Sequence, residues 1–272
     1  PRGIMTKDIS GRPDAPTTPK RVVMMLEELG PTFVKFGQLL STRPDIIPSA
    51  YIFELKQLQD DVEGISFEQV KEQVEKELKS KLEDLFLEFD PEPLAAASLS
   101  QVHNAVIPGD QKVVVKVQRP HIERIIRTDL EILMNIVRLA ERRIPESRVY
   151  EPVAKLEELT DAMIRELDFT EEGWNIEKFR GNFEGDDTTY VPRVFDELTT
   201  KKVITMEYIE GKKVSELPVL PKEPRQRAAK RIAEAMMKQV FVHGFFHGDP
   251  HPGNILIKKD GRISFIDFGL MG

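Results

Sequence analysis

The segment from Asp249 to Gly269 constrains the fold of this chain more than any other stretch. Residues 255–266 read Ile-Leu-Ile-Lys-Lys-Asp-Gly-Arg-Ile-Ser-Phe-Ile, and two short apolar runs around a Lys-Asp-Gly turn predict a β-hairpin. Because a hairpin returns the chain to its starting point, we expect Asp267 to lie beside Asn254. Carboxylate and amide oxygens suit a hard cation such as Mg²⁺. From this segment alone, an ordinary buried hairpin with acidic residues at its ends is the alternative.

The spacing around this hairpin adds a chemical meaning. Asn254 follows Asp249 by five positions, and Asp267-Phe-Gly269 comes after the hairpin, which is the D-x-x-x-x-N and D-F-G arrangement of protein kinases. Phosphoryl transfer needs one carboxylate near the attacking nucleophile and metal-bound oxygens against the phosphates. The spacing therefore predicts a catalytic role for Asp249 and metal-binding roles for Asn254 and Asp267.

A second hairpin is predicted further upstream. Residues 112–117 read Lys-Val-Val-Val-Lys-Val after a Pro-Gly-Asp turn, which is typical of a strand. Lys116 then stands among valines, where a buried ammonium group needs a partner. An edge strand with Lys116 facing water explains the pattern equally well on local evidence. The alternative is the kinase lysine that binds the α- and β-phosphates.

Apolar periodicity and turn residues outline the remaining elements. We expect helices near residues 18–29, 33–40, 49–59, 66–78, 120–143, 151–179 and 223–242, capping boxes at 66–69 and 80–83, and strands at 191–194 and 202–209. In the 151–179 helix, Asp168 and Glu172 would share a face, whereas Glu166 would point away from Glu172. These acids would serve different cationic partners, unless they simply face solvent.

Composition excludes several classes of protein. A net charge of −7 argues against a nucleic-acid-binding protein, and the absence of cysteine excludes disulfides, thiolate metal sites and a catalytic cysteine. No apolar run is long enough to span a bilayer. We expect residues 1–19 to form a flexible lead-in, and the chain to be a piece of a longer protein whose anchoring segments lie outside it.

Taken together, these motifs resemble the UbiB family of atypical kinase-like proteins, also called aarF-domain-containing kinases. The resemblance runs from about Lys20 to Gly272. It rests on Lys35-Phe-Gly37-Gln38 for the K-x-G-Q signature, Ala95-Ala96-Ala97-Ser98 for the alanine-rich loop, Lys116 for the kinase lysine, Glu166-Leu-Asp168 for the E-x-D motif, Glu172 for the helix glutamate, and the Asp249–Gly269 motifs. Ser100 departs from the pattern, because the family usually has glycine there, and serine lacks glycine's access to positive φ.

The resemblance implies an α+β, bilobal protein-kinase-like fold with an added N-terminal helical extension and a truncated C-lobe. The segments would be a K-x-G-Q helical extension (20–90), an N-lobe with inserted helices (91–211) and the start of a C-lobe (212–272). ATP or ADP and Mg²⁺ are the implied cofactors. The nucleotide would contact the alanine-rich loop, Lys116, and the strand end at Glu207 and Ile209, while Glu172 would hold Lys116 and Lys35 would pair with Glu166 over the pocket.

The implied function is that of an Mg²⁺-dependent ATPase or small-molecule or lipid kinase that supports ubiquinone or related prenyl-lipid biosynthesis at membranes. The implied locations are a bacterial inner membrane, a mitochondrion or a plastid, and the partners a membrane lipid or quinone-biosynthesis proteins; a homodimer is left open. A nucleotide-sensing scaffold without turnover would carry the same residues. An ordinary Ser/Thr kinase fits worst, because H-R-D and G-x-G-x-x-G motifs are missing.

Overall fold

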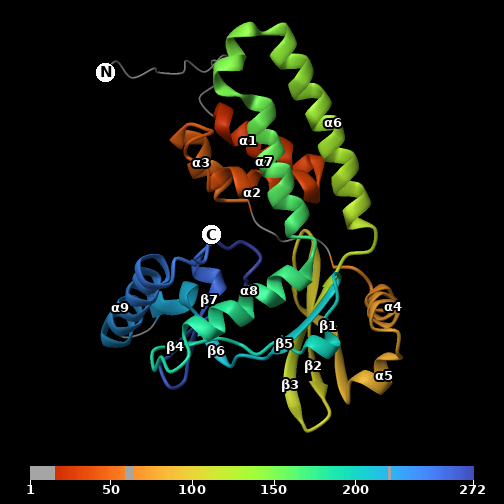
Figure 1. Cartoon of the computed structure of the whole chain (residues 1–272), viewed down its shortest axis with the longest axis vertical. Coiled ribbons are helices and arrows are strands. Elements are labelled where there is room, and N and C mark those ends of the chain that lie inside the picture. Colours follow the sequence, from red (N-terminus) through yellow and green to blue (C-terminus); the bar gives the residue numbers. More distant parts are fainter. Residues whose placement is uncertain (1–15, 59–63, 220–221) are drawn as a thin grey trace. The chain divides into compact units, whose positions relative to one another are not determined.

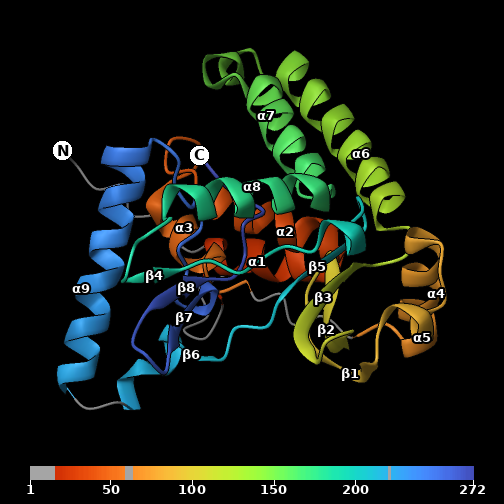
Figure 2. The same ribbon diagram turned by 60° about the horizontal axis from the view of Figure 1, so that its bottom comes forward.

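The computed structural model describes residues 16–58, 64–219 and 222–272 (Figures 1 and 2). The expected lead-in therefore lies mostly outside the described residues. Contacts divide the chain into two units, one formed by residues 1–62 and 123–163 and the other by residues 63–122 and 164–272. The boundaries of these units differ from those of the three segments expected from the sequence. The three segments therefore stay predictions.

The first unit is helical. Helices α1 (Thr18–Leu29), α2 (Pro31–Ser41) and α3 (Ser49–Leu55) enclose a small apolar core. Helices α6 (Ile122–Arg143) and α7 (Pro152–Arg165) form a hairpin around the 3₁₀ turn η1 (Pro145–Tyr150). Asp129 of α6 accepts a hydrogen bond from the Thr32 hydroxyl of α2 at 2.6 Å, which fixes the hairpin to the three-helix core.

Gly37 allows the three helices of this core to approach closely. A Cβ placed there would overlap Leu58 Cδ1 and lie 2.9 Å from Leu26 Cδ1 and 3.2 Å from Leu55 Cδ2. We expect Gly37→Ala to lower the free energy of unfolding by about 1 kcal/mol, because overpacking outweighs alanine's helix propensity. Gly181→Ala is the control, since nothing lies within 4 Å of a Cβ there. Urea denaturation checks both variants, and equal stabilities would contradict the expectation.

The second unit contains two four-stranded sheets. The first is antiparallel with strand order β1-β2-β3-β5 and comprises β1 (Glu88–Ala96), β2 (Ser100–Ile107), β3 (Gln111–Gln118) and β5 (Val203–Glu207). Side chains alternate between the faces of a strand. Val113, Val115 and Val117 of β3 accordingly share a core with α4 (Phe67–Leu78) and α5 (Leu82–Leu85). Lys116 therefore faces the opposite side, toward helix α8 (Phe169–Asn182).

The second sheet carries the predicted hairpin. Its strand order is β4-β8-β7-β6, with β4 (Thr189–Tyr190), β6 (Gly211–Lys213), β7 (Ile255–Lys258) and β8 (Ile263–Phe265). Strands β7 and β8 are antiparallel, and the Ile266 amide donates to the Asn254 carbonyl at 3.0 Å. The expectation that Asp267 returns beside Asn254 is confirmed. Helix α9 (Lys222–Lys238) contacts β8 and continues into the π-turn η4 (Gln239–His243); the short 3₁₀ turns are η2 (Asp196–Leu198), η3 (Val214–Val219) and η5 (Pro252–Asn254).

The single helix expected over residues 151–179 is wrong. The structure has two helices, α7 ending at Arg165 and α8 beginning at Phe169. The break occurs because Asp168 caps α8, its carboxylate accepting hydrogen bonds from the amide (3.1 Å) and hydroxyl (2.5 Å) of Thr170. Short acidic side chains favour such caps over helix interiors. The expected face-sharing of Asp168 with Glu172, and the opposed direction of Glu166 on the same helix, therefore do not hold.

Two other local predictions also fail. The strand expected over residues 191–194 is absent; its only ladder contact is one isolated bridge between Val194 and Met206, as expected for a segment whose Pro192 lacks an amide donor. The capping box at 80–83 is also absent, because α5 begins at Leu82, whose amide is bound by the Glu75 carboxylate instead. The capping box at 66–69 is confirmed.

Buried His103 gives the second unit a pH-dependent stability. Its Nδ1 lies 2.8 Å from the Asp90 carbonyl and its Nε2 lies 3.0 Å from the side-chain nitrogen of Gln101. Nε2 therefore accepts and Nδ1 donates, which is the neutral imidazole. Burial lowers the pKa of His103, although the Asp90 carbonyl acts in the opposite direction.

A lowered pKa in the folded state means that the unfolded state binds the extra proton first. We therefore expect the free energy of unfolding to fall as the pH drops below about 6.5. Urea denaturation at pH 7.5 and pH 5.5 should show this fall in the wild-type chain. The fall should be smaller in His103→Asn and unchanged in His121→Asn, because His121 is exposed. Equal pH dependence of all three chains would contradict the assignment.

Candidate functional site

Lys116 and Glu172 form the centre of the candidate site. The Lys116 ammonium lies 3.1 Å and 2.9 Å from the two carboxylate oxygens of Glu172, which lies on α8 and is buried. It also lies 3.7 Å from Asp267 Oδ1 and 5.2 Å from the centre of the Phe169 ring. The edge-strand interpretation of Lys116 is therefore wrong, because β3 lies inside the sheet and this ammonium group faces two carboxylates.

The charges of this cluster are strongly coupled. Burial acts to lower the pKa of Lys116, but Asp267 and Glu172 outweigh it and raise the pKa. Burial raises the pKa of Glu172, and Lys116 acts against that shift. Lys116 therefore stays protonated at neutral pH, and its positive charge is available to an incoming anion at the partly exposed side of the cluster.

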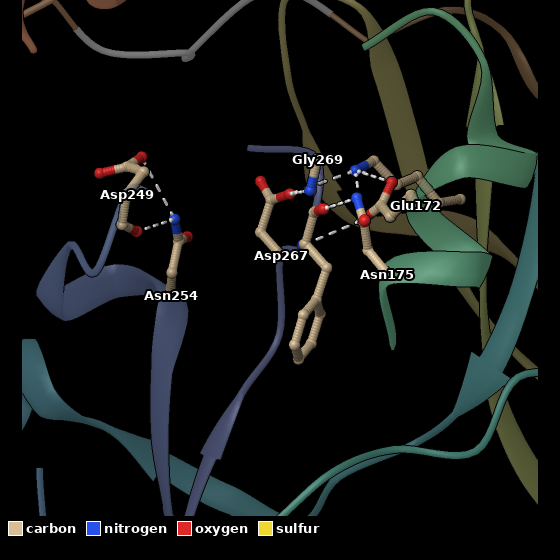
Figure 3. A network of polar contacts seen from close by, with 8 residues as sticks. Glu172, Asn175, Asp249, Asn254, Asp267 and Gly269 are labelled. Atoms are coloured by element: carbon tan, nitrogen blue, oxygen red, sulfur yellow. Dashed lines mark hydrogen bonds and ion pairs between the residues drawn. The ribbon is translucent and has the colours of Figure 1, made fainter. Parts of the chain in front are cut away.

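The Asp267-Phe268-Gly269 segment is fixed from two sides. The Phe268 ring is fully buried and packs edge-on against Phe179 at 5.2 Å. The Phe268 carbonyl accepts a hydrogen bond from Asn175 Nδ2 at 2.9 Å, and the Phe268 amide donates to Glu172 Oε1 at 3.4 Å (Figure 3). Asp267 is thereby held at the start of the buried segment with its carboxylate half-exposed.

Sequence reasoning missed Asn175. It stands three residues after Glu172, so the two side chains share one face of α8, and both contact the same short segment. The signal that could have found Asn175 is this i, i+3 spacing to a glutamate already singled out.

Asp249 and Asn254 form the other side of the site (Figure 3). Asn254 Nδ2 donates to the Asp249 carbonyl at 3.3 Å and to the Asp249 carboxylate at 3.4 Å. The Asp249 amide in turn donates to Nδ1 of the buried His247 at 3.2 Å. Burial lowers the pKa of His247, so the imidazole is a neutral acceptor that orients the loop.

This geometry fits an Mg²⁺ ion bound together with phosphate. Because the Asn254 amide nitrogen is bound to Asp249, its Oδ1 is left as an acceptor with no hydrogen bond to the described residues. Asp267 supplies a half-exposed carboxylate oxygen. In the part of the chain that the structure describes, no three acidic or histidine side chains gather into a complete metal cage. Mg²⁺ in phosphoryl-transfer sites is held by one or two carboxylates and the substrate phosphates, which agrees with this sparse set.

The alanine-rich segment ends a strand and turns tightly. Ala95 and Ala96 belong to β1, and the turn that follows is closed by a hydrogen bond from the Ala97 amide to the Ser100 carbonyl at 2.8 Å. Arg119 Nε donates to the Ala97 carbonyl at 2.9 Å, and the Ser98 side chain is buried. Ser100 begins β2 and lies outside the positive-φ residues of the described chain. The turn therefore does not need glycine at this position.

Glu207 and Ile209 lie at and beyond the end of β5. The Glu207 carboxylate accepts hydrogen bonds from the Tyr190 hydroxyl at 2.6 Å and 2.8 Å, and from the Arg193 amide at 3.3 Å. Burial and this carboxylate raise the pKa of Tyr190 to about 12. The Glu207 side chain is thus occupied, and its amide donates to the Arg193 carbonyl at 2.8 Å, so the expected nucleotide contact would have to use its backbone carbonyl.

The remaining predicted residues belong to different units. Lys35, Gly37 and Gln38 lie on α2 in the first unit, where Gln38 Nε2 donates to the Leu58 carbonyl at 3.3 Å. Glu166 lies in the second unit, with its Cγ 3.9 Å from a Cβ placed on Gly269. The pairing of Lys35 with Glu166 stays a prediction.

Asp168 has a structural role. It caps α8 and forms an ion pair with Lys201 at 3.1 Å. Burial would raise the pKa of Asp168, but the hydrogen bonds from Thr170 and Lys201 outweigh it and lower the pKa. The contacts of Asp168 that the structure shows are thus the cap of α8 and the ion pair with Lys201, and its family-specific role stays a prediction.

The model of the ABC1 atypical kinase-like domain matches residues 57–272. The chain belongs to this family. The UbiB resemblance is confirmed, and the fold of this ABC1-family chain is kinase-like, with mixed helices and sheets.

Several relatives support the assignment. The chain is 41% identical over 258 residues to the "Probable protein kinase UbiB" of Marinobacter nauticus, covering 93% of this chain and 47% of that protein. It is 42% identical over 250 residues to the chloroplastic "Protein ACTIVITY OF BC1 COMPLEX KINASE 8" of Arabidopsis thaliana, covering 90% and 33% of the two chains. The chain thus spans about half the length, or less, of these curated relatives.

A solved structure shows the same fold. It is a complex of Rv3197 with erythromycin from Mycobacterium tuberculosis, matched with a TM-score of 0.70 and 30% sequence identity over 93% of this chain and 64% of that one. Among the described residues of this ABC1-family chain, no helix combines the length and apolar character that crossing a membrane requires.

Proposed function

We propose that this ABC1-family chain binds ATP with Mg²⁺ and acts as an atypical kinase or ATPase. The observation that carries the proposal is the cluster of Lys116, Glu172 and Asp267, with Lys116 2.9 Å from one carboxylate and 3.7 Å from the other. A polyphosphate placed beside this ammonium group would replace part of its attraction to Asp267. Asp267 would then be available to an accompanying metal ion.

The residues of this cluster and of the Asp249–Asn254 loop would have separate tasks. Lys116, oriented by Glu172, would bind phosphate oxygens. Mg²⁺, held by Asp267 and by the free amide oxygen of Asn254, would supply neutralisation of charge on the phosphates. Asp249 would orient or deprotonate the acceptor, either a hydroxyl group or water.

Titration with a fluorescent ATP analogue tests the nucleotide site. Lys116→Met should weaken Mg²⁺·ATP binding by at least about tenfold, since a charge-assisted contact to phosphate is lost. Lys112→Met is the matched control, because Lys112 lies on the same strand and is exposed. Wild-type affinity in Lys116→Met would overturn the proposal.

A phosphate-release assay separates turnover from binding alone. Release that depends on Mg²⁺ and is lost in Asp249→Asn would support the enzyme. Nucleotide binding without release would instead indicate a nucleotide-sensing scaffold.

We further propose, on the UbiB and BC1-complex-kinase names of the relatives, that the chain supports the synthesis of ubiquinone or a related prenyl lipid at membranes. A quinone profile of cells lacking the protein tests this role.

A further inference from the structure

The peptide unit that joins Phe268 to Gly269 is bound at both of its polar ends (Figure 3). Its carbonyl, on Phe268, accepts a hydrogen bond from Asn175 Nδ2 at 2.9 Å. Its amide, on Gly269, donates to Asp267 Oδ1 at 3.2 Å. Because a trans peptide unit is planar, its carbonyl and its amide point in opposite directions and rotate together. A side chain that holds the carbonyl therefore also fixes the direction in which the amide meets Asp267.

The carboxylate oxygen that this amide binds also faces the lysine of the cluster. Asp267 Oδ1 lies 3.7 Å from the Lys116 ammonium nitrogen, so the Gly269 amide and the ammonium group share one oxygen. A carboxylate that turned about its own side-chain bonds would lose both contacts. The direction of the Asp267 carboxylate thus depends on a continuous series of contacts, from Asn175 through the Phe268–Gly269 peptide to Lys116.

The buried ring of Phe268 does not replace the contact from Asn175. The ring packs edge-on against Phe179 at 5.2 Å, which fixes the position of residue 268 in the core. The Phe268 amide, bound to Glu172 at 3.4 Å, lies on the N-terminal side of the same residue. Neither contact fixes ψ of Phe268, the dihedral that rotates the peptide to Gly269. Among the described residues, Asn175 is the partner from outside the segment that binds its carbonyl.

Asparagine in the middle of α8 is explained by this contact better than by the helix. Asparagine is a weak helix former, because its short polar side chain competes for nearby backbone groups. The Asn175 amide is instead directed out of α8, to a carbonyl 93 residues away in the chain. Its neighbours Ile176 and Phe179 are fully buried in the core that contains the Phe268 ring. The helix therefore presents one polar donor to the segment against which its apolar residues pack.

We infer that Asn175 is a positioning residue for the proposed Mg²⁺ site. Through the Phe268–Gly269 peptide it holds the Asp267 carboxylate in the direction that the metal ion needs, without touching the metal or the phosphates. The inference rests on the proposed binding of ATP with Mg²⁺ and adds a residue to that site. Residues that support a metal ligand in this way typically contribute about tenfold to hundredfold to metal affinity.

Hydrogen–deuterium exchange of the chain without nucleotide tests the contact itself. Asn175→Leu keeps the size of the side chain, removes the donor and favours the helix. The Phe268 carbonyl then has no partner from α8, so residues 265–272 should exchange at least about fivefold faster than in the wild-type chain. The remaining amides of α8 should exchange as before. Asn182→Leu, at the last residue of the same helix, is the control and should change neither region.

Calorimetric titration with ATP, in Mg²⁺ and in EDTA, tests the role at the metal site. Asn175→Leu should weaken Mg²⁺·ATP binding by about tenfold. The affinity for ATP in EDTA should stay within about twofold of the wild-type value, because Glu172 still holds Lys116. A purely structural role of Asn175 would instead lower both affinities alike. Asn175→Ala carries the same expectations and serves as the second variant if leucine overpacks the site.

Wild-type exchange over residues 265–272 in both Asn175 variants would overturn the inference. An equal loss of affinity in Mg²⁺ and in EDTA, or an unchanged Mg²⁺·ATP affinity, would also overturn it. A wild-type chain that binds no nucleotide would refute the proposed function, and the metal-site role of Asn175 with it. The exchange measurement needs no nucleotide, so it would still decide whether Asn175 holds the Phe268–Gly269 peptide.

Discussion

Asp267→Asn should remove Mg²⁺-dependent nucleotide binding. Asparagine keeps the size of the side chain but loses the negative charge that would hold the metal ion. Mutation of a residue that only supports a metal ligand typically lowers metal affinity by about tenfold to hundredfold. Loss of a direct ligand should therefore reduce Mg²⁺·ATP affinity by at least about that factor. The variant should also lower the pKa of Lys116 relative to the wild-type chain, because one of its two close carboxylates disappears.

Calorimetric titration with ATP in Mg²⁺ and in EDTA checks this result. The difference between the two affinities should be large in the wild-type chain and nearly absent in Asp267→Asn. Asp260→Asn is the control, since Asp260 lies in the same β7–β8 hairpin and, among the described residues, pairs with Arg262 at the surface. Equal Mg²⁺ dependence in Asp267→Asn and the wild-type chain would remove Asp267 from the metal site.

Glu172→Gln should lower the free energy of unfolding more than the Gly37→Ala substitution does. Glu172 is buried and holds Lys116 through both carboxylate oxygens, and breaking a buried pair by removing one partner leaves an uncompensated charge. Asp267 at 3.7 Å still attracts Lys116, so we expect a loss of about 2 kcal/mol rather than the upper end of the usual range. Urea denaturation measures this loss directly.

Two further chains make this test specific. Glu171→Gln, at the exposed neighbour on α8, should leave the free energy of unfolding nearly unchanged. Lys116→Met/Glu172→Leu should be more stable than Glu172→Gln alone, because removal of both charges leaves neither one buried without a partner. If Glu172→Gln were as stable as the wild-type chain, the buried pair would not be a significant interaction in solution.

Local sequence patterns were sufficient for the elements in which one physical rule dominates. The β7–β8 hairpin followed from two apolar runs around a Gly-containing turn, and it determined the positions of Asn254 and Asp267. The valines of β3 likewise predicted a strand. Its alternation explains in retrospect why Lys116 faces α8 instead of the core beneath α4. The ABC1-family assignment confirmed the family resemblance that rests on these motifs.

Other features depended on which of several possible partners a side chain binds, and the sequence alone does not show this. The helix predicted over residues 151–179 is interrupted at Asp168, because the Asp168 carboxylate accepts hydrogen bonds from the Thr170 amide and hydroxyl and so caps a new helix. The capping box expected at Ser80 does not form, because the carboxylate of Glu75, in the preceding helix α4, accepts the hydrogen bond from the Leu82 amide. Asn175 was missed because its partner is a backbone carbonyl 93 residues away, at Phe268. The sequence does not display such a long-range contact, and the i, i+3 spacing to Glu172 was its one local signal.

Helix α8 holds both the strand that carries Lys116 and the segment that begins at Asp267. Glu172 holds Lys116, and Asn175, less than one turn further along, holds the Phe268 carbonyl next to Asp267. Because one helix sets both positions, neither can be withdrawn while the other stays in place. A sideways shift or a rotation of α8 would therefore displace Lys116 and the Asp267–Gly269 segment in the same movement, so their arrangement would be lost, or regained, together.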